Sequence, residues 1–530
     1  MQPLHSIEPA AVRARIRDGR EVAFLDLREA GPHGRAKPLF AVNIPLGHLE
    51  ERIHALVPRQ STPIILFDAE TGLSQRGAEV LAALGYTEVV RVRGTLADWR
   101  RAGAELFRDT NVPSKAFGEW VEQEAHTPEI SAEELKALRD RGEDVVVIDD
   151  RPFTEYRVAT VPGSINVPGA ELILRAQELQ RSPDTLVVVH CAGRTRSLIG
   201  TQTLVNSGLF RRVVGLRDGN IGWHLAGFSL EHGADRRAPV HLAPANHARA
   251  RAAATHLAER TGVRFLTAAE LARWEREADR HSLFKFDVRS PEEFAARRAP
   301  GFASAPGGQL IQATDEYIGV LNARVVLGDD DGVRAATTAS WLRQLGFEQV
   351  AVLRDGLRDQ LASLPTPERA WVRPPDVPQI EPNSLQSLIG TPGVVVVDLR
   401  LSSEYAAGHI PGSWYAPRAR LAEALPAFPR AERIILVSSD GYRAAFAQPE
   451  LQALTTAAVT ILAGGFSAWP LRGRPVQTGL IRAAVPPDDI YRRPLENDPD
   501  AMKRHYIAWE LGLPAQVRND GTARFVVHTP

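Results

Sequence analysis

Short runs of apolar residues recur along the chain, and amphipathic stretches separate them. Residues 145–148 and 186–189 are apolar at every position, which is typical of strands buried on both faces of a sheet. Residues 132–139 and 336–343 instead show the spacing of helices with one buried face. This alternation predicts an α/β fold of parallel sheets with helices on both faces.

One short pattern opens four segments of the chain. An apolar run ends in Asp, one further residue and Arg, and its aspartates are Asp26, Asp149, Asp287 and Asp398. These aspartates are 123, 138 and 111 residues apart, and a second apolar run follows each of them. A period of this length is too long for a solenoid repeat, so each copy is expected to hold its own core. The pattern predicts four copies of one α/β unit.

The repeat suggests a division of the chain into four units and a tail. We predict unit 1 over residues 1–110, unit 2 over 127–235, unit 3 over 262–368, unit 4 over 379–476 and a C-terminal tail over 477–530. Residues 110–127 are interpreted as the first linker. The tail departs from the repeat and predicts one helix that starts after Asp498 and ends near Gly512.

Composition narrows the classes of function. The chain has 63 Lys plus Arg against 64 Asp plus Glu, so no basic excess indicates nucleic acid as a partner. No apolar run approaches the ~18 residues of a membrane span, and the N-terminus lacks the pattern of a signal peptide. The 15 histidines are scattered and predict no metal site. We therefore expect a cytoplasmic protein that binds neither nucleic acid nor membrane.

Cys191 is the only cysteine of the chain and excludes an internal disulfide. It follows the apolar run 186–190 and precedes a helical stretch, so helix N-terminal amides are expected to face it. Arg194 and Arg196 add positive charge, which predicts a thiolate favoured well below the ordinary thiol pKa of ~8.5. A lone cysteine is more often a small buried hydrophobe. The setting between strand and helix, flanked by arginines, favours a nucleophile.

The segments around Cys191 resemble the rhodanese family of sulfurtransferases. Three motifs carry the resemblance in order along the chain: Asp149-Asp150-Arg151 with Glu155-Tyr156 and Val161-Pro162-Gly163, then Cys191 to Ser197, then the turn Gly219 to Trp223. The resemblance implies a cysteine that alternates between thiol and persulfide, with no other cofactor. It implies transfer of sulfane sulfur from thiosulfate, or another anionic donor, to a small thiol or protein acceptor, with cyanide as the acceptor in an assay.

The resemblance and the chemistry of the side chains assign the site. The residues are Cys191 as the nucleophile, Ala192, Gly193, Arg194, Thr195, Arg196 and Ser197 as the donor-binding loop, Arg151 as a further donor contact, and Asp149 as the brace of the loop. Guanidinium groups bind oxyanions through paired hydrogen bonds, so a cationic loop favours thiosulfate over mercaptopyruvate. For Arg151 a structural ion pair with Asp149 or Glu155 is the alternative.

The other three units lack the nucleophile. Asp68, Asp329 and Ser438 stand where unit 2 has Cys191, so units 1, 3 and 4 are expected to be inactive in sulfur transfer. Arg76, Arg334 and Arg443 correspond to Arg196, either as anion ligands or as solvated surface residues. By analogy with paired family members, unit 1 is expected to wall the Cys191 pocket, and units 3 and 4 to form a second pair.

Two other classes of function compete with the enzyme. In a sulfur carrier or regulatory scaffold, Cys191 would take sulfur from one partner protein and pass it to another without turnover. A dual-specificity phosphatase of related fold would need a loop one residue longer, with its arginine six positions after the cysteine. Here Arg196 is five positions after Cys191, which makes the ring too small for a phosphate ester.

Overall fold

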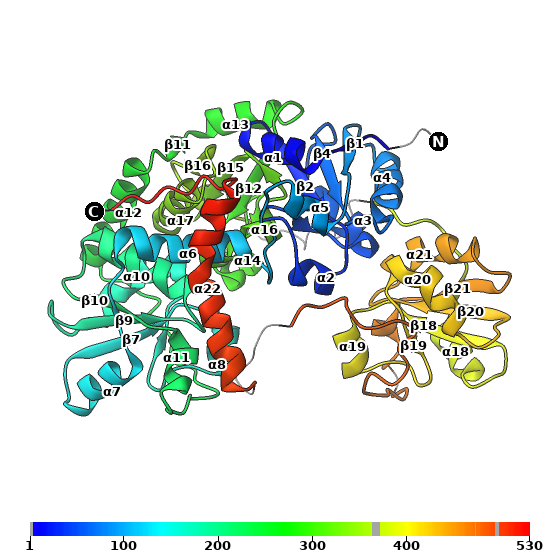
Figure 1. Ribbon diagram of the computed structural model, residues 1–530. Helices are drawn as coiled ribbons and strands as arrows, with labels where there is room; N and C mark the ends of the chain where they lie inside the picture. The colour runs from blue at the N-terminus through cyan, green and yellow to red at the C-terminus, as the bar shows by residue number, and fades with distance from the viewer. Residues whose placement is uncertain (1–3, 363–371, 472, 493–497, 530) are drawn as a thin grey trace.

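A computed structural model describes residues 4–362, 372–471, 473–492 and 498–529 of the chain. These residues form four sheets with helices packed around them (Figure 1). Leaving aside β14 (Val320–Leu321), the five strands of each unit have the order 1-5-4-2-3, and all of these pairings are parallel. The predicted fold class, tandem α/β units with small parallel sheets and a tail that contains a helix, is confirmed.

Units 1 and 2 follow one plan. The strands of unit 1 are β1 (Ser6–Ile7), β2 (Val22–Asp26), β3 (Val42–Asn43), β4 (Ile64–Phe67) and β5 (Val89–Val92), and its helices are α1 (Pro9–Arg17), α2 (Ala30–Arg35), η1 (Leu46–His48), α3 (Leu49–Leu56), α4 (Leu73–Ala83) and α5 (Leu96–Arg101). The strands of unit 2 are β6 (Glu129–Ile130), β7 (Val145–Asp149), β8 (Ile165–Asn166), β9 (Leu186–His190) and β10 (Val213–Leu216), and its helices are α7 (Ala132–Asp140), α8 (Phe153–Val158), η2 (Gly169–Glu171), α9 (Leu172–Arg175), η3 (Ala176–Leu179), α10 (Thr195–Ser207) and α11 (Gly219–Leu225).

Units 3 and 4 repeat the plan. Unit 3 has the strands β11 (Arg264–Leu266), β12 (Leu283–Asp287), β13 (Ala303–Ser304), β14 (Val320–Leu321), β15 (Arg324–Gly328) and β16 (Val350–Leu353), with the helices α12 (Pro244–Arg260), α13 (Ala268–Arg276), α14 (Pro291–Ala296), α15 (Gly307–Gln312), α16 (Thr314–Tyr317), α17 (Val333–Gln344) and η4 (Arg358–Gln360). Unit 4 has the strands β17 (Gln379–Ile380), β18 (Val394–Asp398), β19 (Trp414–Tyr415), β20 (Arg433–Val437) and β21 (Ala458–Leu462), with the helices α18 (Pro382–Leu388), α19 (Ser402–Ala407), η5 (Arg418–Arg420), α20 (Leu421–Ala424), η6 (Leu425–Ala427), α21 (Tyr442–Gln452) and η7 (Phe466–Ala468). The predicted end of unit 3 at residue 368 lies outside the described residues.

The central strands are buried because both faces of each sheet carry helices. All residues of β2, β4 and β9 are buried, as their continuous apolar runs predict. Helix starts are set by local chemistry, for example by the capping box in which Ser131 and Glu134 bond each other's backbone amides ahead of α7. The strands thus end at one edge of the sheet, where the following loops and helix N-termini meet.

Besides α12, which precedes the first strand of unit 3, two more long helices lie outside the repeat. Residues 110–127, predicted as the first linker, contain the largely buried helix α6 (Val112–Ala125). The tail helix α22 (Asp500–Asp520) crosses α6 (Figure 1, red over cyan). It passes the expected end at Gly512 and even contains Pro514, because Leu513 and Val517 are buried against Phe107, Val112 and Ala116. Packing outweighs the local stop signals that the sequence shows.

The units pair differently from the expectation. Unit 3, not unit 1, packs against unit 2: the indole Nε1 of Trp341 in α17 donates to Thr203 Oγ1 in α10 at 2.7 Å. Unit 4 packs against unit 1, where Arg418 of η5 binds Glu50 of α3 at 2.7 and 2.8 Å (Figure 1). The expected pairing was wrong because no local motif reports which helix faces are complementary.

Unit 1 also joins unit 3. Strand β14 pairs antiparallel with β2, and one hydrophobic cluster runs through both units from Leu25 and Leu66 to Phe286 and Leu327.

No helix within the described ranges is long and apolar enough to span a bilayer.

The buried ion pair between units 1 and 4 gives a testable prediction. Replacing Glu50 by Gln should destabilise the chain by about 2–3 kcal/mol in urea unfolding, because Arg418 stays buried with one carboxylate partner fewer. The matched control Glu423→Gln removes an exposed partner of Arg420 in the same unit and should change stability little. Equal effects of the two substitutions would contradict the pairing of units 1 and 4.

Candidate functional site

Cys191 lies directly beyond the carboxyl end of β9, before α10. Its side chain is buried, with 3% of the residue exposed. The sulfur lies 3.5 Å from the hydroxyl of Ser197, which in turn donates to the carbonyl of Arg194 at 2.9 Å. The backbone N–H of Ser197 also donates to the sulfur. The loop from Cys191 to Ser197, here called the Cys191 loop, therefore curls around its own cysteine.

The Cys191 loop is held in place by hydrogen bonds from the turn at the start of α11. The amides of Asn220 and Ile221 donate to the carbonyls of Cys191 and Ala192 at 2.9 and 3.0 Å. Gly219 has a φ of +52°, and a side chain there would collide with the carbonyl of Cys191. The turn from Gly219 to Trp223 thus holds the Cys191 loop in its conformation.

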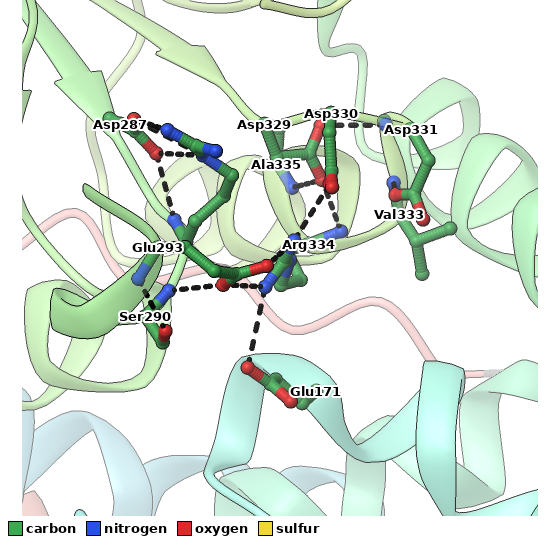
Figure 2. Close-up of polar contacts among 12 residues, drawn as sticks. Glu171, Asp287, Ser290, Glu293, Asp329, Asp330, Asp331, Val333, Arg334 and Ala335 are labelled. Atoms are coloured by element: carbon green, nitrogen blue, oxygen red, sulfur yellow. Dashed lines mark hydrogen bonds and ion pairs between the residues drawn. The ribbon is translucent and has the colours of Figure 1, made fainter. Parts of the chain in front are cut away.

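The other three units show what this loop geometry accommodates. In unit 3 the carboxylate of Asp329 accepts from the amides of Gly332, Arg334 and Ala335 at 2.6, 2.9 and 3.1 Å (Figure 2). In unit 1 Asp68 accepts from Glu70 and Ser74, and in unit 4 the Ser438 hydroxyl accepts from Ala444. The amide six residues after the cysteine position faces that side chain in all four units. We call this arrangement the anion cradle.

The thiol itself is not acidic in this structure. Burial raises the pKa of Cys191, the neighbouring Asp150 carboxyl raises it further, and Arg196 and Ser197 lower it only in part. The expectation of a thiol pKa well below its ordinary value is therefore wrong. The sequence shows that the arginines lie near the cysteine. It does not show the burial of the thiol or the nearby Asp150 carboxyl, which raise the thiol pKa and oppose the arginines.

Arg194 points to carboxylates outside the loop. Its guanidinium Nε binds Glu119 of α6 at 2.8 and 3.0 Å, and its Nη1 binds Asp218 at 3.0 Å. The side chain is buried between these partners. Arg194 thus ties the loop to α6, and its predicted role as a donor ligand has no support in this geometry.

Arg196 lies closer to the sulfur. Its two terminal nitrogens bind the carboxylate of Glu155 at 2.8 Å each, and one reaches Gln309 of unit 3 at 3.4 Å. Its positive charge acts on the Cys191 sulfur and lowers the thiol pKa. Arg196 is therefore the cation of the loop that influences the reacting atom.

Asp149 and Arg151 form a buried ion pair, the alternative weighed for Arg151. Arg151 donates to both carboxylate oxygens, at 3.0 and 2.7 Å, and Thr160 adds a bond at 2.7 Å. Burial raises the pKa of Asp149, but His190, Arg151 and Thr160 outweigh it and leave that pKa below its ordinary value. The same pair recurs in units 1, 3 and 4, which have no cysteine. It braces the fold of every unit.

The remaining loop residues are placed as follows. Thr195 begins α10 and is buried against Gly118 of α6, whereas Ala192 is partly exposed. Gly193 faces α22, where an added methyl group would lie 3.6 Å from Glu510 Oε2. The tail helix therefore contacts the Cys191 loop, a contact with no signal in the sequence.

The arginines that correspond to Arg196 all bind protein groups at the interfaces. Arg334 binds Glu293 and Asp330 of its own unit and Glu171 of unit 2 (Figure 2). Arg443 binds Glu51 of unit 1, and Arg76 donates to the carbonyl of Ala419 in unit 4. These arginines join paired units.

Three carboxylates of unit 3, those of Asp329, Asp330 and Asp331, have oxygens within 4.8 Å of one another. Asp330 is bound to Arg334, and Asp331 to His247 and the amide of Val333. Each carboxylate of this cluster is thus used by the fold.

Sequence reasoning missed Asp150 and the wall that unit 3 supplies. A small cavity of about 20 Å³ behind the Cys191 loop is lined by Asp150, Arg196 and Gly200 of unit 2 and by Ile311 and Trp341 of unit 3. A cleft of about 340 Å³ adjoins it between the same units and shares Asp150 and Gly308. The Asp-x-Arg repeat contained a signal for Asp150, since the middle residue is apolar in the other three copies.

The sequence model of the family described as "Rhodanese-like domain" matches residues 131–226, 267–362 and 381–471. A crystal structure of thiosulfate sulfurtransferase from Pseudomonas aeruginosa is 46% identical and covers 99% of this chain and 100% of that one, with a TM-score of 0.96. Residues 1–130 lie outside the three matched segments, although unit 1 has the same strand order as the others.

Curated relatives match over single units. A sulfurtransferase of Allochromatium vinosum is 29% identical over 102 residues, 19% of this chain and 92% of that protein. The HTH-type transcriptional regulator Rv0324 of Mycobacterium tuberculosis is 36% identical over 105 residues, and the putative sulfur carrier protein YrkF of Bacillus subtilis is 32% identical over 102. These matches cover 20% and 19% of this chain, which spans 45% and 54% of the lengths of those two proteins.

The Arg194 ion pair predicts a stability effect. Arg194→Met should destabilise the chain by about 3–5 kcal/mol in denaturant unfolding, because Glu119 is left buried without its cation. Adding Glu119→Gln should restore much of the loss. The control Arg211→Met, which removes an exposed ion pair with Asp184, should have little effect. A double variant as unstable as Arg194→Met alone would contradict this assignment.

Proposed function

The chain belongs to the rhodanese family, and from that premise we propose that it moves sulfane sulfur from thiosulfate to a thiophilic acceptor through a persulfide on Cys191. The sulfurtransferase class follows from the family and from the match over the whole chain. Thiosulfate as the donor and a small thiol or protein as the acceptor are our proposal. So is a cytoplasmic location, which suits a site that must keep its single thiol reduced.

One observation carries this proposal: the sulfur of Cys191 occupies an anion cradle. In units 1 and 3 the same cradle holds the carboxyl group of an aspartate, whose oxygens accept hydrogen bonds from backbone amides, so the amides are arranged to donate to the side chain at this position. In unit 2 the group at that position is a nucleophile that becomes an anion on ionisation and stays one as a persulfide. The amide of Ser197 is the donor that faces it.

The transfer takes two steps. The Cys191 thiolate attacks the outer sulfur of thiosulfate, an S–S bond forms to Sγ, the S–S bond of the donor breaks, and sulfite leaves. An acceptor nucleophile such as cyanide then attacks the outer sulfur of the persulfide and releases the Cys191 thiolate. Arg196 would attract the dianionic donor and steady the anionic sulfur, since its charge reaches Sγ.

A sulfur carrier that passes persulfide between proteins is the second candidate. The likeness to the putative sulfur carrier YrkF, over one unit, favours it. The burial of Cys191 also suits a site that opens only to selected partners. Steady turnover of thiosulfate and cyanide by the purified chain would favour the enzyme, and a single loading with sulfur that does not turn over would favour the carrier.

The nucleophile gives the first test. Cys191→Ser should abolish thiocyanate formation from thiosulfate and cyanide, because a serine hydroxyl is not ionised at neutral pH. The fold should persist, since unit 4 holds Ser438 at the same position with its hydroxyl bonded to the Ala444 amide. Thiocyanate formation by this variant at the wild-type rate would end the proposal.

Arg196 gives the second test. Arg196→Ala should raise the KM for thiosulfate by about tenfold or more and the KM for a neutral persulfide donor much less, because only the dianion gains from the guanidinium charge. Arg211→Ala, at an exposed arginine of the same unit, is the matched control. Equal changes in the two KM values would refute an oxyanion role for Arg196.

A further inference from the structure

The residue between the Asp and the Arg of the repeated motif differs in the unit that holds the cysteine. It is Leu27 in unit 1, Val288 in unit 3 and Leu399 in unit 4, and all three are buried at 2% exposure or less. In unit 2 it is Asp150, which is equally buried at 3%. A carboxyl group thus replaces an aliphatic core residue only beside Cys191.

The Asp150 carboxyl packs against the same helix position as the aliphatic residue of unit 1. A methyl group added at Gly200 would lie 2.7 Å from Asp150 Oδ2 and 2.8 Å from Leu172 Cδ1, and at the equivalent Gly77 it would meet the side chain of Leu27. Neither carboxyl oxygen of Asp150 has a hydrogen-bond partner among the described residues. An unpartnered buried carboxyl destabilises a fold, which argues for a role in the reaction.

Four charged side chains act on this carboxyl. Its pKa is raised to about 8, chiefly by burial; Asp149 and Glu155 raise it too, and Arg196 and Arg151 lower it. Unit 3 lines the small cavity with uncharged residues and the wider cleft also with charged ones, Arg289, Glu292 and Glu293. Asp150 also acts on the thiol, because its negative charge raises the pKa of Cys191. The two groups therefore respond to each other's ionisation.

We propose that Asp150 is the protonation partner of Cys191: the carboxyl and the sulfur share a single negative charge, and Asp150 is neutral whenever the sulfur is anionic. This inference rests on the proposed function for its role in turnover. The charge comparison of the units supports it. Units 1 and 3 hold a carboxyl group in the cradle, that of Asp68 or Asp329, and an aliphatic residue at the position of Asp150.

The proton balance follows. Once the pair has lost one proton, either Asp150 is ionised and Cys191 is a thiol, or the remaining proton lies on Asp150 and the sulfur is a thiolate. The thiolate form attacks thiosulfate, giving the persulfide anion, a neutral Asp150 and sulfite. Cyanide then removes the outer sulfur as thiocyanate, and the thiolate regains the proton from Asp150. Between these steps the pair of Asp150 and the sulfur carries one negative charge, so an ionised Asp150 does not face an anionic sulfur in a medium of low dielectric.

Asp150 acts through the sulfur, as a positioning residue that holds the proton. Its test therefore measures the ionisation of the Cys191 thiol directly. Iodoacetamide alkylates a cysteine through its thiolate and not its thiol, and Cys191 is the only cysteine of the chain, so the modified residue is identified by mass. Asp150→Asn and Asp150→Leu should shift the midpoint of the alkylation rate against pH downward by about one pH unit, because the competing charge is gone. Asp184→Asn, which removes an exposed carboxylate of the same unit, should leave the profile unchanged.

A profile that does not move, or that moves upward, in Asp150→Asn would overturn the shared charge. Asp150→Leu introduces the leucine that units 1 and 4 have at the equivalent position. Because it replaces an unpartnered buried carboxyl with an apolar side chain, this variant should also unfold at a higher denaturant concentration than the wild type. Asp150→Asn keeps the shape of the carboxyl and serves if the leucine variant fails to fold.

The second measurement tests the loaded state. At a pH where the infrared spectrum shows the resting Asp150 carboxyl to be ionised, thiosulfate should add one sulfur by intact mass, and the infrared difference spectrum should gain the C=O band of a protonated carboxyl. Asp150→Asn should gain the sulfur without the band. Sulfur gained without the band in the wild type would overturn the inference and leave the function standing. No gain in mass would refute the function, and the alkylation profile would still decide the shared charge.

Discussion

The backbone N–H of Ser197, at the start of α10, donates to the side chain of Cys191, and the chemistry of the site depends on that contact. A buried strand, a tight loop and a helix N-terminus are needed to make it, and the four units make it alike. Because the amide is part of the fold, the cradle forms whatever the side chain is: carboxylate in Asp68 and Asp329, hydroxyl in Ser438. The side chain alone decides whether the cradle is structural or reactive.

Charge neutralisation within the protein follows from the same constraint. Arginines lie close to the cradles, and most of them form ion pairs with carboxylates of the protein, so they are not available to bind a ligand. Arg194 is held by Glu119, and Arg334 by Glu293 and Asp330. Arg334 also binds Glu171 and so joins unit 3 to unit 2. Arg443 and Arg76 join units 1 and 4 in the same way. Arg196, bound to Glu155 beside the sulfur, combines a structural contact with an effect on the reacting atom.

The sequence was informative wherever a local pattern sets the structure. Continuous apolar runs predicted the strands, and the Asp-x-Arg repeat predicted four units of one fold. The place of Cys191 between strand and helix predicted the cradle. What failed depends on contacts between distant segments. The low pKa expected for the thiol ignored burial and Asp150, and the pairing of units depends on helix faces such as that of Trp341. The 110–127 segment is a helix because its apolar face meets α22, which lies nearly 400 residues later.

The central claim, that the cradle of unit 2 carries sulfur on Cys191, is tested most directly by intact-mass measurement of the full chain after thiosulfate. The wild type should gain one sulfur atom per chain and release it as one equivalent of thiocyanate when cyanide is added, and Cys191→Ser should gain none. An unchanged mass, or an equal gain in the serine variant, would contradict it.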